Sequence, residues 1–195
     1  VSVGEVQVAL RFIQVWRSHD PGVRFVLSTV TSTGRRVARE GADPRDVVVY
    51  APLDFPFCLR PAWRAIRPRF LVLVEGEWWP NWLCWAWGER VPVVVINGRL
   101  SARSFRRFRW VRFWTRRLVG LPTAFYMQSE RDRERLLELG ADPGRVEVLG
   151  SAKYDGIRDD ARAAGRGREI LAEAGWKPEE LLILVGGSTW PGEEV

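Results

Sequence analysis

Residues 70–81 read Phe-Leu-Val-Leu-Val-Glu-Gly-Glu-Trp-Trp-Pro-Asn, and this stretch decides the fold of the chain. The apolar run Phe70–Val74 is typical of a strand buried on both faces of a parallel sheet. Two carboxylates, Glu75 and Glu77, follow at once, and Pro80 suits the first turn of a helix. Since ligands of open α/β sheets bind beyond the carboxyl ends of the strands, we expect both acids to line a cleft. The alternative is an acidic turn that only caps the next helix.

Further apolar runs that predict strands lie on both sides of this stretch, separated by segments that predict helices. The predicted strands are 23–30, 47–50, 70–74, 91–96, 123–127 and 146–149. The predicted helices are 62–67, 80–89, 101–119 and 129–139, with an N-terminal helix whose apolar face holds Val6, Ala9, Leu10, Ile13 and Trp16. The hydroxyl-rich segment 31–34 can cap another helix. This alternation predicts an α/β class fold, a Rossmann-like parallel sheet with helices on both faces.

The chain divides into three predicted parts. Residues 1–158 form the Rossmann-like domain, and the charged, Gly/Ala-rich segment 159–180 reads as a linker with a helical piece. Residues 181–195 hold a new apolar run and a glycine-rich loop, which predict the beginning of a second lobe. We expect an opening strand, a membrane anchor and the rest of the second lobe to be encoded outside this fragment.

Composition narrows the classes of function. The chain has 195 residues, of which 46% are hydrophobic, so it holds enough apolar surface for a core. Its net charge of +6 points to an anionic partner. The 11 tryptophans suit ligand walls or membrane interfaces, although no apolar run is long enough to span a membrane. His19 is the only histidine, which disfavours most catalytic triads and zinc sites, and Cys58 and Cys84 are expected to be buried, reduced thiols.

The N-terminal segment offers a second carboxylate for the cleft. Ser2 and Gly4 are small residues at the start of the first predicted helix, where free N–H groups and the helix dipole attract anions. Glu5 falls in the first turn of that helix. It either complements the dipole, which is worth about 0.3–1 kcal/mol, or acts as a base that faces the crevice.

An arginine-rich helix is predicted from Ser101 to about Val119, within a stretch that lacks acids from residue 91 to 129. On one helical wheel Trp110, Val111, Trp114 and Leu118 share the sector expected to face the sheet. Phe105, Phe108 and Phe113 then lie outside it, among arginines. Such a surface fits an anionic membrane, a phosphorylated lipid or nucleic acid, or it is simply a solvated basic face. The candidate phosphate- or membrane-binding residues are Arg103, Arg106, Arg107, Arg109 and Arg112.

Five segments, taken together and in order, resemble one family. They are Ser-Val-Gly-Glu (2–5), Glu-Gly-Glu-Trp-Trp-Pro-Asn (75–81), Asn-Gly-Arg-Leu-Ser (97–101), Gly-Ser-Ala-Lys-Tyr-Asp (150–155) and Gly-Ser-Thr-Trp-Pro-Gly-Glu-Glu (187–194). The chain thereby resembles the 3-deoxy-D-manno-octulosonic acid (Kdo) transferases, which attach Kdo to the lipid A precursor. Gly76, Gly98 and Trp190 depart from the threonine, alanine and histidine common in that family.

The resemblance implies a two-lobed GT-B glycosyltransferase, whose N-terminal lobe takes the lipid acceptor and whose C-terminal lobe takes most of the donor, CMP-Kdo. It implies an inverting transfer without a metal or cofactor, with Glu5 as the base. The cleft or acceptor residues implied are Ser2, Gly4, Glu75, Glu77, Asn81, Arg99 and Ser101. The donor-binding residues implied are Lys153, Ser188, Thr189 and Glu194.

Three functions remain open from the sequence. The first is a Kdo transferase that acts in lipopolysaccharide biosynthesis at the cytoplasmic face of the bacterial inner membrane, with this fragment peripheral to the bilayer. The second is a non-catalytic basic module that binds nucleic acid or anionic lipid through residues 99–117. The third is another GT-B enzyme, such as a sugar-nucleotide epimerase, which segments 2–5 and 78–81 argue against.

Overall fold

The computed structural model describes residues 3–76, 78–152, 169, 172–173 and 175. The chain separates into two compact units, 1–154 and 155–195, and the elements described below belong to the first. The predicted linker and the predicted start of a second lobe fall largely outside the described residues, and the predicted domain bounds stay a prediction.

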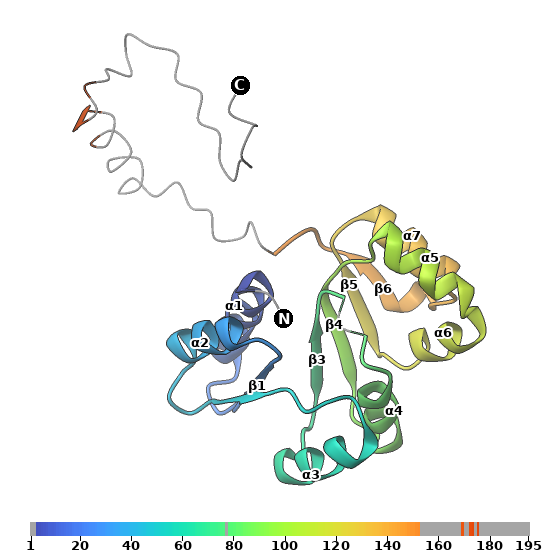
Figure 1. Cartoon of the computed structure of the whole chain (residues 1–195), viewed down its shortest axis with the longest axis horizontal. Coiled ribbons are helices and arrows are strands. Elements are labelled where there is room, and N and C mark those ends of the chain that lie inside the picture. The colour runs from blue at the N-terminus through green and yellow to red at the C-terminus, as the bar shows by residue number, and fades with distance from the viewer. Residues whose placement is uncertain (1–2, 77, 153–168, 170–171, 174, 176–195) are drawn as a thin grey trace. The chain divides into compact units, whose positions relative to one another are not determined.

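Helices and strands alternate along the first unit (Figure 1). They are α1 (Val3–His19), β1 (Val26–Thr29), α2 (Ser32–Gly41), β2 (Val47–Tyr50), α3 (Pro56–Ile66), β3 (Leu71–Val74), α4 (Pro80–Gly88), β4 (Val93–Gly98), α5 (Ala102–Trp110), α6 (Arg112–Val119), β5 (Ala124–Met127), α7 (Glu130–Glu138), the 3-10 turn η1 (Pro143–Arg145) and β6 (Val146–Val148). The α/β class predicted from the sequence is confirmed. Helix α3 begins six residues earlier than predicted, at Pro56.

The strands pair in parallel, as predicted, but in two sheets. β1 pairs with β2, and the larger sheet has the order β3-β4-β5-β6. In the larger sheet Leu71 lies opposite Val93, and Phe125 lies opposite Val146. Because its four strands are parallel, their carboxyl ends meet at one edge, where the chain leaves toward the next helix (Figure 1).

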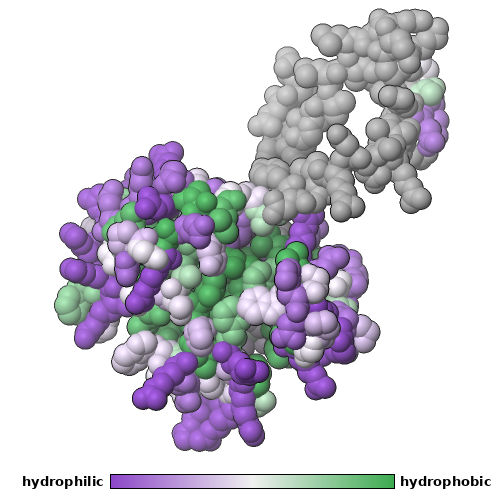
Figure 2. Space-filling view, turned by 180° about the vertical axis from the view of Figure 1, so that it is seen from behind, coloured by the Kyte–Doolittle hydropathy of each residue, from purple (hydrophilic) through white to green (hydrophobic). Residues whose placement is uncertain are grey.

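The core explains why the apolar runs predict strands so well. Consecutive residues of a strand point to opposite faces, and Val95 and Ile96 are both buried, so both faces of β4 are covered. Phe125 from β5 and Leu136 from α7 complete this core, and burying a side chain such as Phe125 contributes about 1.5–3 kcal/mol. On the face shown in Figure 2, hydrophobic residues lie across the middle of the described unit, with hydrophilic side chains projecting around them.

Hydroxyl residues start three of the helices. The side chain of Thr31 accepts a hydrogen bond from the N–H of Gly34 at the start of α2, and Ser101 and Ser129 cap α5 and α7 in the same way. The predicted capping roles of segment 31–34 and of Ser101 are therefore confirmed. These caps satisfy N–H groups that have no partner within the helix.

The prediction of a single helix over residues 101–119 is wrong. The helix is interrupted at Val111, whose φ and ψ are −106° and 36°. Thr115 Oγ1 donates to the Phe108 carbonyl across the break, 3.0 Å away. The inward face of α5 holds Phe105 and Phe108, whereas that of α6 holds Thr115 and Val119. One wheel drawn across both helices therefore assigns the wrong inward sector.

Because of this break, the aromatic residues that were expected to face the sheet point toward solvent instead. Trp110 is 95% exposed, and Trp114 and Val111 are also exposed, while Leu118 is half-buried. Of the phenylalanines predicted to lie outside, only Phe113 is exposed, at 72%. The prediction of buried cysteines is also wrong: Cys84 is exposed on the outer side of α4 and Cys58 is half-buried, although both are free thiols as expected.

Candidate active site at the carboxyl ends of the strands

Two neighbouring strands of the larger sheet end in left-handed residues with polar side chains. Glu75 follows β3 with φ of 60°, and Asn97 lies at the end of β4 with φ of 51°. Both are buried, with 8% and 5% of their surface exposed. A left-handed residue that has a Cβ costs roughly 1–2 kcal/mol, although asparagine tolerates this conformation better than most. The fold thus holds both polar groups inward at a cost in backbone energy.

Asn97 joins the ends of three strands through its hydrogen bonds. Its side-chain Nδ2 donates to Glu75 Oε1 at 3.3 Å, and its Oδ1 accepts from the N–H of Ala152 at 3.0 Å. Gln128, which follows β5, donates from Nε2 to the Asn97 carbonyl at 2.8 Å. Both ends of the Asn97 amide are therefore used, which fixes its orientation. The sequence analysis did not select Asn97; an asparagine before glycine at the end of an apolar run was the available signal.

Two glycines let the backbone segments of this site approach one another. A Cβ on Gly76 would lie 3.3 Å from the carbonyl oxygen of Arg99, and one on Gly98 would lie 2.6 Å from Met127 Sδ. The segments after β3 and β4 are therefore in contact at Gly76. Gly76 and Gly98, two of the three departures from the family pattern, fall at positions where this chain leaves little room for a side chain.

The loop that carries Arg99 and Ser101 is held by a carboxylate that the sequence analysis missed. Asp132, buried at the start of α7, accepts from the N–H of Leu100 at 2.9 Å and from Ser129 Oγ at 2.6 Å. Arg135 donates to the Leu100 carbonyl at 2.6 Å. Arg99 and Ser101 are exposed on either side of this fixed point. The Ser129–Asp132 spacing, which resembles a capping box, was the only local signal.

Asn81 has a structural contact at the start of α4. Its Nδ2 donates to the Asp54 carbonyl at 2.6 Å, while the carboxylate of Asp54 accepts from the N–H groups of Asn81 and Trp82 at 3.2 and 3.1 Å. Asp54, which the sequence analysis did not select, therefore caps α4 from the loop after β2. This contact positions the segment that follows the Glu75 turn, and the predicted ligand role of Asn81 stays a prediction.

Helix α1 brings Glu5 toward the same edge. The Trp16 ring packs on the Phe70 ring with centroids 5.1 Å apart, so the end of α1 lies beside the beginning of β3. The two elements run in opposite directions (Figure 1). From Trp16 back to Glu5 the helix spans roughly 16 Å, and from Phe70 to Glu75 the strand spans about the same length. Glu5, half-buried in the first turn of α1, therefore lies toward the end at which β3 finishes.

The remaining predicted site residues fall into two groups. Gly4 is half-buried beside Glu5, and the arginines of α5 and α6 are exposed: Arg103, Arg106, Arg107, Arg109 and Arg112. The others lie outside the described residues and stay predictions: Ser2, Glu77, Lys153, Ser188, Thr189 and Glu194. Within the described ranges no three His, Cys, Asp or Glu side chains gather in a way that could hold a metal ion.

The parallel α/β fold and the polar groups at its strand ends define a class of protein: an open α/β lobe with polar residues at the carboxyl edge of its sheet, the edge at which such folds bind ligands. Comparison with known proteins specifies it further. Residues 1–156 match the family model described as 3-deoxy-D-manno-octulosonic-acid transferase (kdotransferase), and the chain belongs to this family.

Several curated proteins resemble the chain. A 3-deoxy-D-manno-octulosonic acid transferase from Chlamydophila psittaci is 32% identical over 192 residues, which cover 97% of this chain and 43% of that protein. One from Haemophilus influenzae is 27% identical over 198 residues, covering 99% and 44%. A bifunctional glycosyltransferase/methyltransferase from Fusobacterium nucleatum is 32% identical over 155 residues, covering 78% and 24%. The chain spans less than half the length of these relatives.

Proposed function

We propose that the full-length protein transfers Kdo from CMP-Kdo to the lipid A precursor in lipopolysaccharide biosynthesis, with inversion and without a metal ion. Family membership supports the class of reaction. The observation that carries the proposal is the Asn97 network, because the Asn97 side chain bonds to both Glu75 and Ala152. Three of the five segments that resemble the family thus meet at one edge of the sheet, the place where an open α/β lobe binds its ligand.

In the proposed reaction the acceptor hydroxyl attacks the ketosidic carbon of Kdo, and the bond from that carbon to the phosphate oxygen of CMP breaks. Glu5 takes the proton from the hydroxyl, and CMP leaves with the bonding electron pair as a phosphate anion. General-base help from a carboxylate is worth about 10²–10⁴-fold in rate. Helix N-termini and basic groups stabilise the leaving phosphate. Glu75, oriented by Asn97, lines the acceptor side of the cleft.

A transfer assay tests this function. Full-length protein incubated with CMP-Kdo and lipid A precursor in the presence of EDTA is expected to release CMP and to yield a lipid heavier by one or more Kdo units. Mass spectrometry of the extracted lipid gives the number of units added. Loss of transfer on adding EDTA would contradict the metal-independent mechanism. Release of CMP without a heavier lipid would contradict the acceptor assignment.

We also propose that α5 and α6 contact the anionic headgroups of the cytoplasmic face of the inner membrane. The break at Val111 supports this role, since Trp110, Phe113 and Trp114 project into solvent among arginines. Indole and phenyl rings favour headgroup depth, and arginines favour an anionic surface. In the described part of the chain no helix is long and apolar enough to cross a bilayer.

Vesicle flotation tests this contact. Each arginine near an anionic surface contributes about 1 kcal/mol, so replacing Arg106, Arg107, Arg109 and Arg112 with Gln is expected to reduce flotation on phosphatidylglycerol vesicles at least tenfold. Replacing Trp110, Phe113 and Trp114 with Ser should give a similar loss. Trp87→Ser is the control, because Trp87 is about as exposed as Phe113 and Trp114 but lies on α4. Unchanged flotation, or displacement by nucleic acid at moderate salt, would contradict the membrane assignment.

A further inference from the structure

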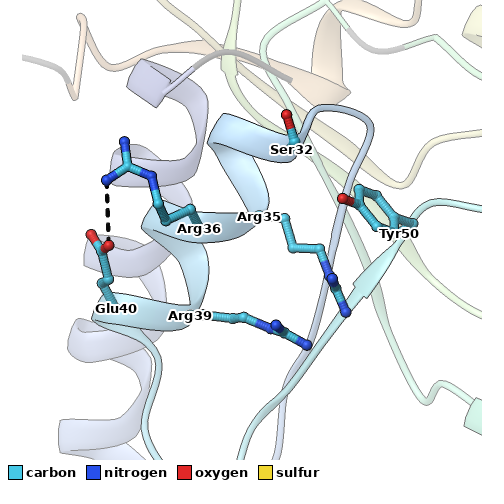
Figure 3. Close-up of a pocket in the computed structure, with 6 residues that line it drawn as sticks. All are labelled: Ser32, Arg35, Arg36, Arg39, Glu40 and Tyr50. Carbon is cyan, nitrogen blue, oxygen red and sulfur yellow. Dashed lines mark hydrogen bonds and ion pairs between the residues drawn. The ribbon is translucent and has the colours of Figure 1, made fainter.

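A small cavity lies between α2 and β2, and none of its lining residues belongs to the Asn97 network. Its volume is about 220 Å³, and it is lined by Ser32, Arg35, Arg36, Arg39, Glu40 and Tyr50 (Figure 3). Three of these six residues are arginines and one is an acid. The cavity is smaller than the roughly 300–1,000 Å³ of sites that hold drug-sized ligands. It therefore fits a small anionic group.

The arginines of this cavity differ in their partners. Arg36 turns away from β2 and pairs with Glu40 at 3.5 Å (Figure 3). Arg35 and Arg39 extend toward β2 instead, and in the described part of the chain neither forms an ion pair. Glu40, the one acid that lines the cavity, is thus paired with Arg36 and not with Arg35 or Arg39. Among the described residues, the guanidinium groups of Arg35 and Arg39 therefore have no carboxylate partner, and that of Arg35 lies over the Tyr50 ring.

Arg35 is held in place before any ligand arrives. Its guanidinium carbon lies 4.5 Å from the centre of the Tyr50 ring, a cation–π contact that orients the planar group. Its Nε is buried and has no hydrogen-bond partner among the described residues. A buried N–H donor without an acceptor is uncommon, because losing its hydration is costly. Guanidinium groups bind phosphate in a two-pronged geometry, so the oriented group offers its remaining N–H donors to an oxygen anion.

Exposed apolar side chains follow this cavity along the chain. Leu53 lies three residues after Tyr50, no more than about 10 Å along the backbone. Phe55 and Phe57 stack with ring centroids 5.5 Å apart, and all three side chains are exposed. A cationic cavity followed by exposed apolar residues matches a ligand with a phosphate group and a hydrocarbon chain.

We propose that the cavity between α2 and β2 binds a phosphate monoester carried by an acylated ligand. The phosphate lies between Arg35 and Arg39, and an acyl chain packs on Leu53, Phe55 and Phe57. The identification of this ligand with the lipid acceptor rests on the proposed function. The capture of phosphate by the two arginines does not.

Calorimetric titration of the 195-residue chain with inorganic phosphate and with octyl phosphate tests this site. The double variant Arg35→Gln/Arg39→Gln is expected to bind both probes at least tenfold more weakly than the unmodified chain. Arg36→Gln, which removes the same charge from the same helix, should change either affinity less than twofold. Leu53→Ser/Phe57→Ser should retain phosphate binding and lose the extra affinity for octyl phosphate.

Arg39→Gln alone keeps the test decisive if the double variant unfolds, since Arg39 is exposed and makes no ion pair in the described ranges. It should weaken phosphate binding at least threefold. Equal losses from Arg36→Gln and Arg39→Gln would overturn the site in favour of general charge attraction. Equal affinity for inorganic phosphate and octyl phosphate would overturn the proposed contact of an acyl chain with Leu53, Phe55 and Phe57. Because binding is measured without turnover, a chain that binds phosphate while the full-length protein fails to transfer Kdo would contradict the proposed function alone.

Discussion

Full-length enzyme that carries Glu5→Gln is expected to transfer Kdo about 10²–10⁴-fold more slowly while it still binds the lipid acceptor. Glutamine keeps the size and the hydrogen-bonding capacity of the side chain but cannot accept the proton of the acceptor hydroxyl. The loss should therefore appear in kcat, with little change in KM. Single-turnover measurements with saturating CMP-Kdo give the rate of the chemical step, and thermal unfolding shows that the fold is intact.

Glu130→Gln is the matched control for this experiment. Glu130 also lies in the first turn of a helix, α7, but it is exposed. If Glu5 only complements the dipole of α1, the two variants should behave alike, with a loss of about 0.3–1 kcal/mol in stability and normal turnover. Near-normal transfer by the Glu5→Gln enzyme would remove Glu5 from the mechanism.

The strands could be predicted because a strand covered on both faces requires an unbroken apolar run, and the segments that contain β3 and β4 have one. The starts of α2 and α5 could be predicted for a similar reason, since capping depends on a hydroxyl at one position. The carboxyl-edge location of the polar residues then follows from parallel pairing alone. These features are set by short segments of chain.

The features that could not be predicted depend on contacts between distant segments. The break at Val111 is accompanied by a hydrogen bond from Thr115 to Phe108 and by a change in which side chains pack inward, and helical periodicity contains neither. Asp54 and Asp132 reach backbone groups on other elements, and their own segments give little sign of those partners. Asn97 was visible within a quoted segment, but its bond to Glu75 crosses between strands.

Replacing Asn97 is expected to have the second largest effect, because its side chain holds both Glu75 and the segment after β6. Asn97→Ala removes a bond to a carboxylate, worth about 1.5–3 kcal/mol, and one to a backbone N–H, worth about 0.5–1.5 kcal/mol. Allowing for partial rehydration, we expect the free energy of unfolding to fall by about 2–4 kcal/mol. For Asn97→Gly the free energy of unfolding should fall by about 1 kcal/mol less than for Asn97→Ala, since glycine adopts the left-handed backbone without strain. Urea unfolding at neutral pH measures both.

Asn97→Asp separates the charge of the site from its shape. It would place a second carboxylate near Glu75, where the amide nitrogen now lies 3.3 Å from Oε1. Repulsion between the acids would raise the pKa of the pair in the folded protein above its value in the unfolded chain. The variant should therefore be least stable at neutral pH and regain stability relative to the native chain as the pH falls through the raised pKa. A stability difference that does not change between pH 5 and pH 7.5 would show that Glu75 and residue 97 do not interact through charge. The network would then position the strand ends without controlling the charge state of Glu75.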